Sequence, residues 1–428
     1  MSETRGMNSH RRIDGAAQGQ TPSPLRGFVI CSHSFHGLAP VATVRRPFGT
    51  ALSFYVLLFV LAFTSELFAE APANAAKLPP ELRAEAQKAI DQGLAFLVRN
   101  QDKDGGWTSN YGPAVTAIVG QAFVQDAAHG PEHVVVQRAF SGILRHEHSD
   151  GGIYDRKQNL ANYQTSVVLM FLSSLPKDAN QLRVAKAQSF LTKLQYDDAE
   201  KIKTSDAWYG GAGYNSKKRP DLSNTQMMLE ALHQSGLSKD DPVYQKALVF
   251  VSRSQMLEKT NDQKFARGAT DGGFIYTPCD GGQSKASEGL FESAGPPRSY
   301  GSMTYAGFKS MLYAGLTKDD PRIVGCLEWI KQHYTLNENP NLPGKRSHEG
   351  LYYYYHVFAR ALSAWGQLVI TDGGGTPHNW RMELCRKIIS LQRPDGSWLN
   401  EKDRWLEGDA NYVTGLTILT LQTAMGEK

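Results

Sequence analysis

The chain has 428 residues, of which 41% are hydrophobic and 21% charged, so it could form one large domain or two to three ordinary ones. Its formal net charge of +4 gives no electrostatic reason to expect a nucleic-acid partner. Its four cysteines show no Cys-x-x-Cys spacing, which argues against a metal site and against a disulfide framework.

The N-terminal residues have the composition of a leader rather than of a folded domain. Residues 1–44 are rich in Ser, Gly, Arg and Pro and lack an apolar period, which predicts a disordered leader extension. Residues 45–76 contain two arginines, the 13-residue apolar run 51–63 and Ala-x-Ala sequences, the pattern of a signal peptide. The run is shorter than the roughly 20 residues that a membrane-spanning helix needs, so an uncleaved anchor is the weaker alternative and we expect no stable membrane span after cleavage. The sequence therefore predicts an exported protein, periplasmic or secreted, with a single folded domain at 77–428.

The folded domain is predicted to consist of six helix pairs, because its apolar residues recur at helical spacing. The pairs are 81–101 with 113–125, 131–148 with 161–174, 180–196 with 222–235, 241–258 with 302–315, 320–334 with 352–367, and 378–392 with 410–424. The second helices are almost uncharged, as in 163–172 and 411–425, and a helix that is apolar on all sides is buried. The sequence therefore predicts an all-α fold, an (α/α)6 toroid of six inner and six outer helices.

Glycine and aromatic residues mark the loops inside the pairs. Segments 101–107 and 392–398 both read Gln-x-x-Asp-Gly-x-Trp. Weaker marks of the same kind occur at 151–154, 211–214, 272–274 and 350–352. In the two strong copies we expect the Gln to bond backbone groups left open at a helix end, the Gly to permit the turn and the Trp to cover the junction. These segments are therefore interpreted as stabilising joints.

Two connections between pairs have nearly the same sequence. Segments 236–242 and 315–321 both read Gly-Leu-Ser/Thr-Lys-Asp-Asp-Pro. In such a linker the Gly ends one helix, the second Asp caps the next helix and the Pro takes its first position. The paired carboxylates would also suggest a metal site, but capping accounts for every residue.

These Gln-Trp (QW) motifs on helix pairs resemble the repeats of the squalene cyclase and protein prenyltransferase superfamily, the terpenoid cyclase toroids. The resemblance covers roughly 80–425. It implies an α/α toroid with a central apolar cavity and identifies the chain as a divergent secreted member. The repeat specifies the fold and says little about the reaction.

The resemblance also implies where a terpene cyclase would carry its acid, and the motif is altered there. The family protonates an alkene with the middle Asp of Asp-x-Asp-Asp-Thr, whereas this chain has Asp221, Ser223, Asn224 and Thr225 at the matching positions. A serine hydroxyl is too weak an acid to replace the carboxyl group. We therefore expect no squalene-type cyclisation, and the segment also fits a helix cap.

The zinc site implied by the prenyltransferase resemblance is altered as well. Ser302 and Thr304 stand where the family has the Asp and Cys ligands, while Tyr355-His356 matches its Tyr-His pair. Hydroxyls are poor zinc ligands beside thiolate and carboxylate. We expect no metal and no cofactor.

Aromatic and polar residues near the starts of the inner helices predict a small-molecule pocket, although they would also fit a packed interior. The candidate ligand-binding residues are Tyr163, Asp221, Tyr305, Tyr354, Tyr355, His356, Arg360 and Tyr412. His356 is expected to open an inner helix between tyrosine walls, with Arg360 one turn away to hold an anionic group such as phosphate. The glycine-rich insertion 259–301 would be either a lid over one mouth or a surface loop.

Three functions fit these features. The first is an exported protein that binds a small apolar molecule or lipid, isoprenoid-like, with or without turnover. The second is an interaction scaffold, and the third is a secreted polysaccharide lyase or hydrolase that would draw on Glu349, Asp409 and Arg360. A deep apolar pocket would favour the first, a filled centre the second and an open polar groove the third. The sequence indicates neither an oligomeric state nor whether two of Cys279, Cys326 and Cys385 pair.

Overall fold

The computed structural model describes residues 78–287 and 296–426. Contacts between Cα atoms divide the chain into Met1–Glu70 and Ala71–Lys428, and every described residue belongs to the second unit. The predicted leader extension, 1–44, and the predicted signal peptide, 45–76, lie outside the described residues.

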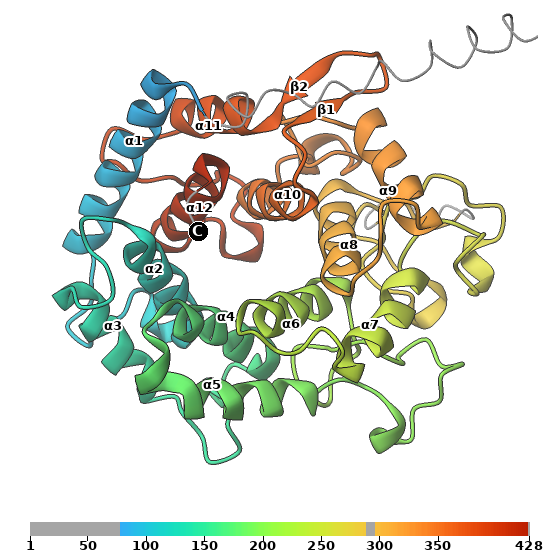
Figure 1. Ribbon diagram of the computed structural model, residues 1–428, viewed down its shortest axis with the longest axis horizontal. Coiled ribbons are helices and arrows are strands. Elements are labelled where there is room, and N and C mark those ends of the chain that lie inside the picture. The colour runs from blue at the N-terminus through green and yellow to red at the C-terminus, as the bar shows by residue number, and fades with distance from the viewer. Residues whose placement is uncertain (1–77, 288–295, 427–428) are drawn as a thin grey trace, which may run out of the picture. The chain divides into compact units, whose positions relative to one another are not determined.

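Twelve α-helices form nearly all of the regular structure in the described part of the chain (Figure 1). They are α1 (Pro80–Arg99), α2 (Pro113–Gln125), α3 (Val134–Leu144), α4 (Ala161–Ser174), α5 (Lys177–Thr192), α6 (Leu222–Gln234), α7 (Pro242–Arg253), α8 (Gly301–Tyr313), α9 (Pro321–Gln332), α10 (Leu351–Trp365), α11 (Trp380–Ser390) and α12 (Ala410–Met425). One antiparallel hairpin, β1 (Val369–Thr371) with β2 (Pro377–Asn379), pairs Ile370 with His378. The fold is therefore all-α, and the predicted helices are confirmed with ends that shift by five residues or fewer.

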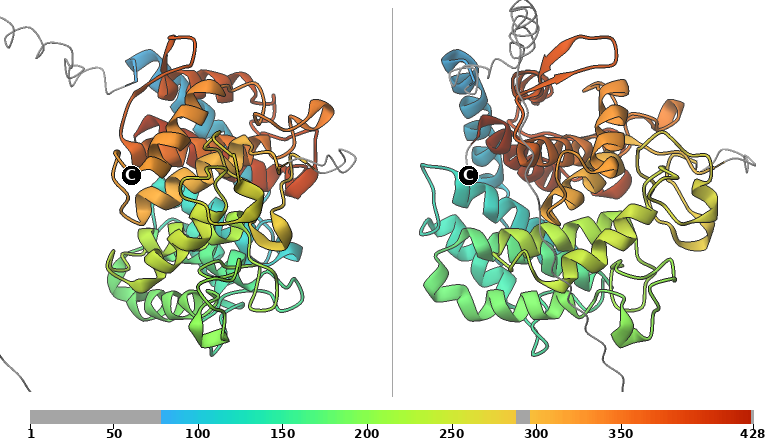
Figure 2. Two further views of the ribbon diagram at one scale, coloured as in Figure 1. Left: turned by 90° about the vertical axis from the view of Figure 1, so that its right-hand side faces the viewer. Right: turned by 45° about the vertical axis from the view of Figure 1, so that its right-hand side comes forward.

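The even-numbered helices pack against one another in chain order. Helix α2 contacts α4, α4 contacts α6, α6 contacts α8, α8 contacts α10, α10 contacts α12, and α12 returns to α2. The odd-numbered helices pack on these, and the two side views of Figure 2 show the insertion between α7 and α8, in yellow, to one side of them. Residues 412–425 of α12 are all buried, whereas α5 buries only one stripe of its surface. The absence of charge from the second helix of each pair therefore did identify buried helices.

A glutamine ties neighbouring repeats together at four joints. Gln101 Nε2 donates to the carbonyl of Gly105 (2.8 Å) and to that of Val135 in α3 (2.9 Å). The same pair of bonds, one to a loop glycine and one to the next odd-numbered helix, is made by Gln195, Gln255 and Gln392. Because Gln392 reaches Ala89 of α1, the last repeat is tied to the first.

The two motif tryptophans are fully buried between the helices of their own repeat. The indole N–H of Trp107 donates to the carbonyl of Leu97 (2.7 Å), and that of Trp398 donates to Ile388 (2.9 Å). In five of the glycine-aromatic segments, a backbone N–H donates a hydrogen bond to the hydroxyl of a threonine near the start of the following helix. These threonines are Thr116, Thr165, Thr225, Thr304 and Thr414. Thr225 and Thr304, which occupy the family's reactive motifs, are therefore joint residues here.

The two similar linkers cap helices as predicted. Gly236 and Gly315 have φ angles of 78° and 86°, the left-handed conformation that glycine adopts without strain. Asp241 accepts from the N–H of Val243, and Asp320 accepts from that of Arg322. The linker carboxylates are therefore engaged in capping.

Three further features bear on the sequence predictions. Cys279, Cys326 and Cys385 are buried free thiols, so no two of them form a disulfide. Among residues 78–287 and 296–426, no helix is long and apolar enough to cross a membrane. The same residues contain no group of three His, Cys, Asp or Glu side chains placed to hold a metal ion.

Candidate ligand-binding cavities

A cavity of about 730 Å³ lies at the N-terminal ends of the even-numbered helices. Its walls come from the first turns of α2, α4, α6, α8, α10 and α12 and from the loops that precede them. Most of the lining is aromatic or aliphatic: Tyr111, Ala114, Val115, Leu160, Tyr163, Tyr214, Tyr276, Tyr300, Met303, Tyr353, Trp405, Leu406 and Tyr412. Polar groups are fewer: Ser223, Asn224, Lys285, Ser302, Asp403 and Asp409.

The polar groups of α6 face this cavity with one acceptor left over. Ser223 Oγ and the hydroxyl of Tyr353 are 3.2 Å apart, and Gln226 Nε2 donates to the same hydroxyl at 3.1 Å. Asn224 donates through Nδ2 to Asp221 (2.9 Å), while its buried Oδ1 has no partner among the described residues. Asn224 Oδ1 is therefore a buried acceptor without a partner next to the cavity wall.

Asp221 lies behind this wall and does not line the cavity. Its carboxylate accepts from the backbone N–H of Asn224 (2.9 Å), so it caps α6, as the alternative interpretation of the motif expected. Burial raises the pKa of Asp221 to about 6 against the lowering effect of its bonds from Asn224. Asp221 was predicted to bind a ligand, but in the structure it could affect one only through Asn224, which lines the cavity.

The loop before α12 forms one side of the mouth and holds a strained backbone. Trp405 and Leu406 have φ angles of 59° and 69°, a conformation that costs a residue with a side chain about 1 kcal/mol or more. Trp405 remains 41% exposed, and the guanidinium of Arg404 lies 4.5 Å from its ring centre. Strain of this kind persists where the surrounding structure imposes it, here beside the cavity mouth.

The residue that follows Leu406, Glu407, is fully buried. Its carboxylate accepts from the N–H of Tyr353 (2.7 Å) and from Asn400 Nδ2 (2.6 Å), so it caps α10, whose own N-cap Gly350 has no side chain. Burial raises the pKa of Glu407 to about 7, although the bonds from Asn400 and from the backbone of Tyr353 lower it. Glu407 is therefore a helix cap in the structure.

This raised pKa predicts a pH-dependent stability. Between the unfolded pKa near 4.5 and the folded pKa near 7, the folded protein holds a proton that the unfolded chain releases. Glu407 therefore adds stability at pH values below 4.5, and this contribution is lost as the pH rises through 7. Glu407→Gln keeps a side-chain oxygen that can accept a hydrogen bond but cannot titrate. Between pH 5 and pH 8 the unfolding free energy of the wild type should therefore fall by roughly 2–3 kcal/mol more than that of Glu407→Gln. Urea titrations at both pH values test this, with the exposed Glu328→Gln as control, and an unchanged pH dependence in Glu407→Gln would contradict it.

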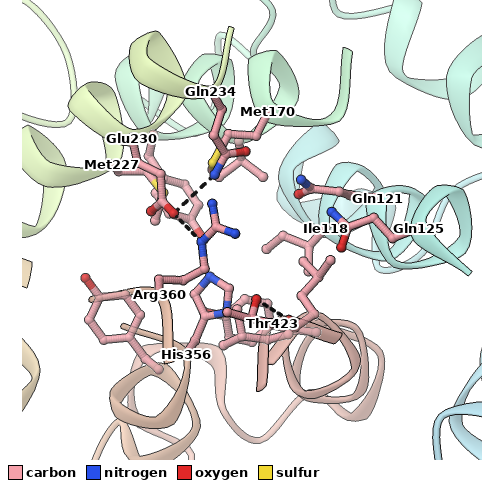
Figure 3. Close-up of a pocket in the computed structure, with 16 residues that line it drawn as sticks. Ile118, Gln121, Gln125, Met170, Met227, Glu230, Gln234, His356, Arg360 and Thr423 are labelled. Carbon is pink, nitrogen blue, oxygen red and sulfur yellow. Dashed lines mark hydrogen bonds and ion pairs between the residues drawn. The ribbon is translucent and has the colours of Figure 1, made fainter. Parts of the chain in front are cut away.

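A second, smaller pocket of about 30 Å³ lies deeper along the same helices (Figure 3). Tyr163, Tyr353 and Tyr412 line both cavities and so stand between them. Burial raises the pKa of Tyr163 to about 12, and it raises the pKa of Tyr412 as well. These tyrosines are therefore neutral at physiological pH.

The smaller pocket contains a buried charged cluster. Glu230 of α6 accepts from Nε of Arg360 in α10 (2.7 Å) and pairs with Lys309 of α8. Burial by itself raises the pKa of Glu230, but Lys309 and Arg360 outweigh it and hold the pKa below its usual range. Burial also lowers the pKa of His356 to about 3, so that its ring is neutral. Burial lowers the pKa of Lys309 more than its pairing with Glu230 raises it, whereas for Arg360 the pairing with Glu230 outweighs burial and raises the pKa.

The structure brings together only part of the predicted site. Tyr163 and Tyr412 line both cavities, and His356 and Arg360 line the smaller one. His356 was expected to open an inner helix, but α10 begins at Leu351, so His356 lies in its second turn and faces the interior.

The other predicted tyrosines lie outside both cavities. The hydroxyls of Tyr354 and Tyr355 donate to the carbonyls of Thr335 and Leu336 (2.7 Å each), and Tyr305 packs with its ring centre 4.9 Å from Phe358. These side chains fill the space between α8, α9 and α10. The predicted tyrosine walls around His356 are therefore formed by Tyr353 instead.

Of the two carboxylates considered for glycan chemistry, Glu349 lines neither cavity, whereas Asp409 lines the larger one. Glu349 pairs with Arg346 (3.0 Å) and Arg404 (2.8 Å), and Asp409 caps α12 through the N–H of Tyr412. The described part of the insertion 259–301 contributes Tyr276, Lys285 and Tyr300 to the wall of the larger cavity. It is also bonded to the loop that precedes α6, since the hydroxyl of Thr277 donates to the carbonyl of Pro220 (2.8 Å).

Glu230 and Lys309 were missed, although the sequence holds a signal for them. Apart from histidines, Glu230, Lys309 and Arg360 are the charged residues within the even-numbered helices. A charge on an otherwise uncharged buried helix needs a partner, because an unpaired charge is costly in the interior. Three such charges on three helices thus point to one cluster.

Comparison with known proteins supports the fold. No model of a protein family matches the sequence, and no curated protein matches it. The apo structure of the type II terpene cyclase MstE from Scytonema is 12% identical, with a TM-score of 0.51 over 81% of this chain and 100% of its own. An MstE variant in complex with its substrate, geranylgeranyl dihydroxybenzoate, gives the same TM-score and identity over 81% and 99%. A polysaccharide lyase matches at 12% identity and a TM-score of 0.50 over 80% and 97%. The chain thus has a terpenoid cyclase-like fold, which it shares with enzymes of more than one chemistry.

Proposed function

We propose that the protein binds an apolar, isoprenoid-like small molecule or lipid in the larger cavity, with or without turnover. The observation that carries the proposal is the cavity itself: about 730 Å³, lined mainly by tyrosine, tryptophan and aliphatic side chains. Ligand pockets typically measure roughly 300–1,000 Å³ and combine apolar walls with a few polar points. The scaffold alternative supposed a filled centre, which this volume does not favour.

The polar points indicate how such a ligand would be oriented. The hydroxyls of Ser223 and Tyr353 lie on one wall of the cavity, and its other polar lining residues are Asn224, Lys285, Ser302, Asp403 and Asp409. A ligand with a hydroxyl group at one end could form hydrogen bonds with Ser223 and Tyr353, while its chain would pack on the aromatic side chains. Ser223 supplies no acid for alkene protonation, so the proposal does not extend to a squalene-type reaction.

Native mass spectrometry of the full chain with farnesol, geranylgeraniol and oligosaccharides tests this proposal. Ala114 lines the cavity at the start of α2, so Ala114→Phe should fill part of the space and weaken isoprenoid binding at least tenfold. Val134→Phe, on the exposed surface of α3, is the matched control and should bind like the wild type. Equal binding by Ala114→Phe would place the ligand elsewhere.

A second candidate is glycan binding at the mouth. Tyr111 and Trp405 line the cavity yet are 44% and 41% exposed, and exposed aromatic faces suit the stacking of sugar rings. Under this proposal Trp405→Ala should lose oligosaccharide binding. Under the isoprenoid proposal the same variant should retain the apolar ligand, whose contacts lie deeper.

We also infer that the even-numbered and odd-numbered helices are the six inner and six outer helices of an (α/α)6 toroid, supported by their order of packing. The QW motifs and the signal-peptide pattern at 45–76 support a divergent, exported member of the squalene cyclase and prenyltransferase superfamily. N-terminal sequencing of the protein from its native host should find a start near residue 70–77 in the periplasm or medium. An intact Met1 in the cytoplasm would contradict export.

A further inference from the structure

We propose that the smaller pocket is a separate binding site for a carboxylate group, with Arg360 as its principal contact. The pocket lies beyond Tyr163, Tyr353 and Tyr412, and Figure 3 shows the guanidinium of Arg360 in its middle, with Gln121 and Gln125 on the facing wall. Tyr163, Tyr353 and Tyr412 line both cavities, but the polar groups of this site line the smaller pocket alone, so this inference does not depend on the ligand proposed for the larger cavity.

The first argument is that one carboxylate, that of Glu230, is shared by two basic side chains. Glu230 is the one acidic residue that lines the pocket, and it faces both Lys309 and Arg360. His356 adds no negative charge, and the groups that α2, α4, α6 and α12 present here are the neutral Gln121, Gln125, Met170, Gln234 and Thr423. Because Glu230 is shared with Lys309 and the side chain of Arg360 is 24% exposed, the guanidinium can pair with a second anion that enters the pocket.

The second argument is the geometry of the guanidinium. Arginine carries five N–H donors, of which the one on Nε of Arg360 is used by Glu230. The remaining N–H groups are directed into the pocket, where a planar carboxylate could accept two of them side by side. Gln234 already donates to Glu230 (3.2 Å), which leaves the amides of Gln121 and Gln125 to complete the contact.

The third argument is size. A pocket that holds one water needs about 10–15 Å³ on this measure, so about 30 Å³ accommodates two waters or a group of comparable size. A carboxylate has three heavy atoms, whereas phosphate and sulfate have five. The pocket therefore favours a carboxylate over the phosphate that the sequence suggested for Arg360.

Formate binding to the full chain tests the site directly. Calorimetric titration with sodium formate, at constant ionic strength balanced by chloride, should show saturable binding to the wild type. Arg360→Gln should weaken it at least tenfold while retaining the fold, because Glu230 and Lys309 remain as a neutral pair. Arg183→Gln is the matched control, since Arg183 pairs with Glu147 (3.1 Å) away from both cavities, and it should bind formate like the wild type.

Equal formate binding by Arg360→Gln, or no saturable binding by the wild type, would overturn the proposal. A crystal structure of the wild type grown in formate provides a test that does not depend on the variant's folding. Formate density is expected beside Arg360, and density only elsewhere would also overturn the proposal.

A second set of titrations distinguishes a small free carboxylate from the carboxylate head of a longer apolar acid. If the site receives the head of a ligand whose chain occupies the larger cavity, farnesoic acid should bind at least tenfold more tightly than both formate and farnesol. Ala114→Phe should then weaken farnesoic acid and leave formate unchanged. Formate binding without any farnesol or farnesoic acid binding would support this site and contradict the function proposed for the larger cavity.

Discussion

Glu230→Gln is expected to lower the free energy of unfolding by about 3–5 kcal/mol at pH 7, the usual cost of removing one partner from a buried ion pair. The side chains of Glu230 and Lys309 are 2% and 0% exposed, and Arg360 shares the same carboxylate. Glutamine has nearly the same shape but no charge, so both cations would be left in the interior without an anion. Denaturant titration of wild type and variant measures the difference.

Two controls separate this electrostatic cost from a general effect of substitution. Glu328 pairs with Lys331 at 2.7 Å but is 57% exposed, so Glu328→Gln should change stability by roughly 1 kcal/mol or less. Adding Lys309→Met to Glu230→Gln removes one unpaired cation and should recover part of the loss. If Glu230→Gln is as stable as the wild type, the buried cluster does not carry the charges that its geometry indicates.

Trp107→Ala and Trp398→Ala are each expected to cost about 3–5 kcal/mol, since truncating a fully buried aromatic side chain leaves a cavity. Each indole also satisfies the carbonyl of a neighbouring helix, Leu97 for Trp107 and Ile388 for Trp398. Urea unfolding followed by circular dichroism measures the change.

Trp405→Ala is the matched control, because the same side chain is removed from an exposed position. It should change the unfolding free energy by less than about 1 kcal/mol. If either motif variant unfolds at the wild-type denaturant concentration, the joint assigned to the Gln-Trp segments does not stabilise the fold.

The helices and joints of this protein could be predicted because their signals are local. The period of apolar residues predicted the ends of α2 and α4 to the residue, and the Asp-Pro linkers predicted the caps of α7 and α9. The sequence did not predict the joints formed by Gln195 and Gln255, and the reason is again local. Their glycine partners follow 15 and 17 residues later, not four, because the loops between are longer.

The candidate site depended on which side of each helix faces the centre. Tyr353, Tyr354 and Tyr355 are chemically identical, but successive residues of an α-helix point in directions about 100° apart, so one of them faces the cavities and the others pack outwards. Tyr353, His356 and Arg360 share a face because they are three and four residues apart. A run of tyrosines has no polar side to reveal that orientation.

By itself, then, the sequence determined the helices, their caps and which helices are buried, since each of these follows from residues close together in the chain. The tertiary structure decided the sites, because their partners are distant: Glu230 meets Lys309 79 residues away and Arg360 130 residues away. It also decided that Glu407 caps α10 from 54 residues beyond Tyr353, and that a cavity remains between the first turns of the even-numbered helices. Neighbouring helices and loops create these contacts and this space, and no local pattern in the chain encodes them.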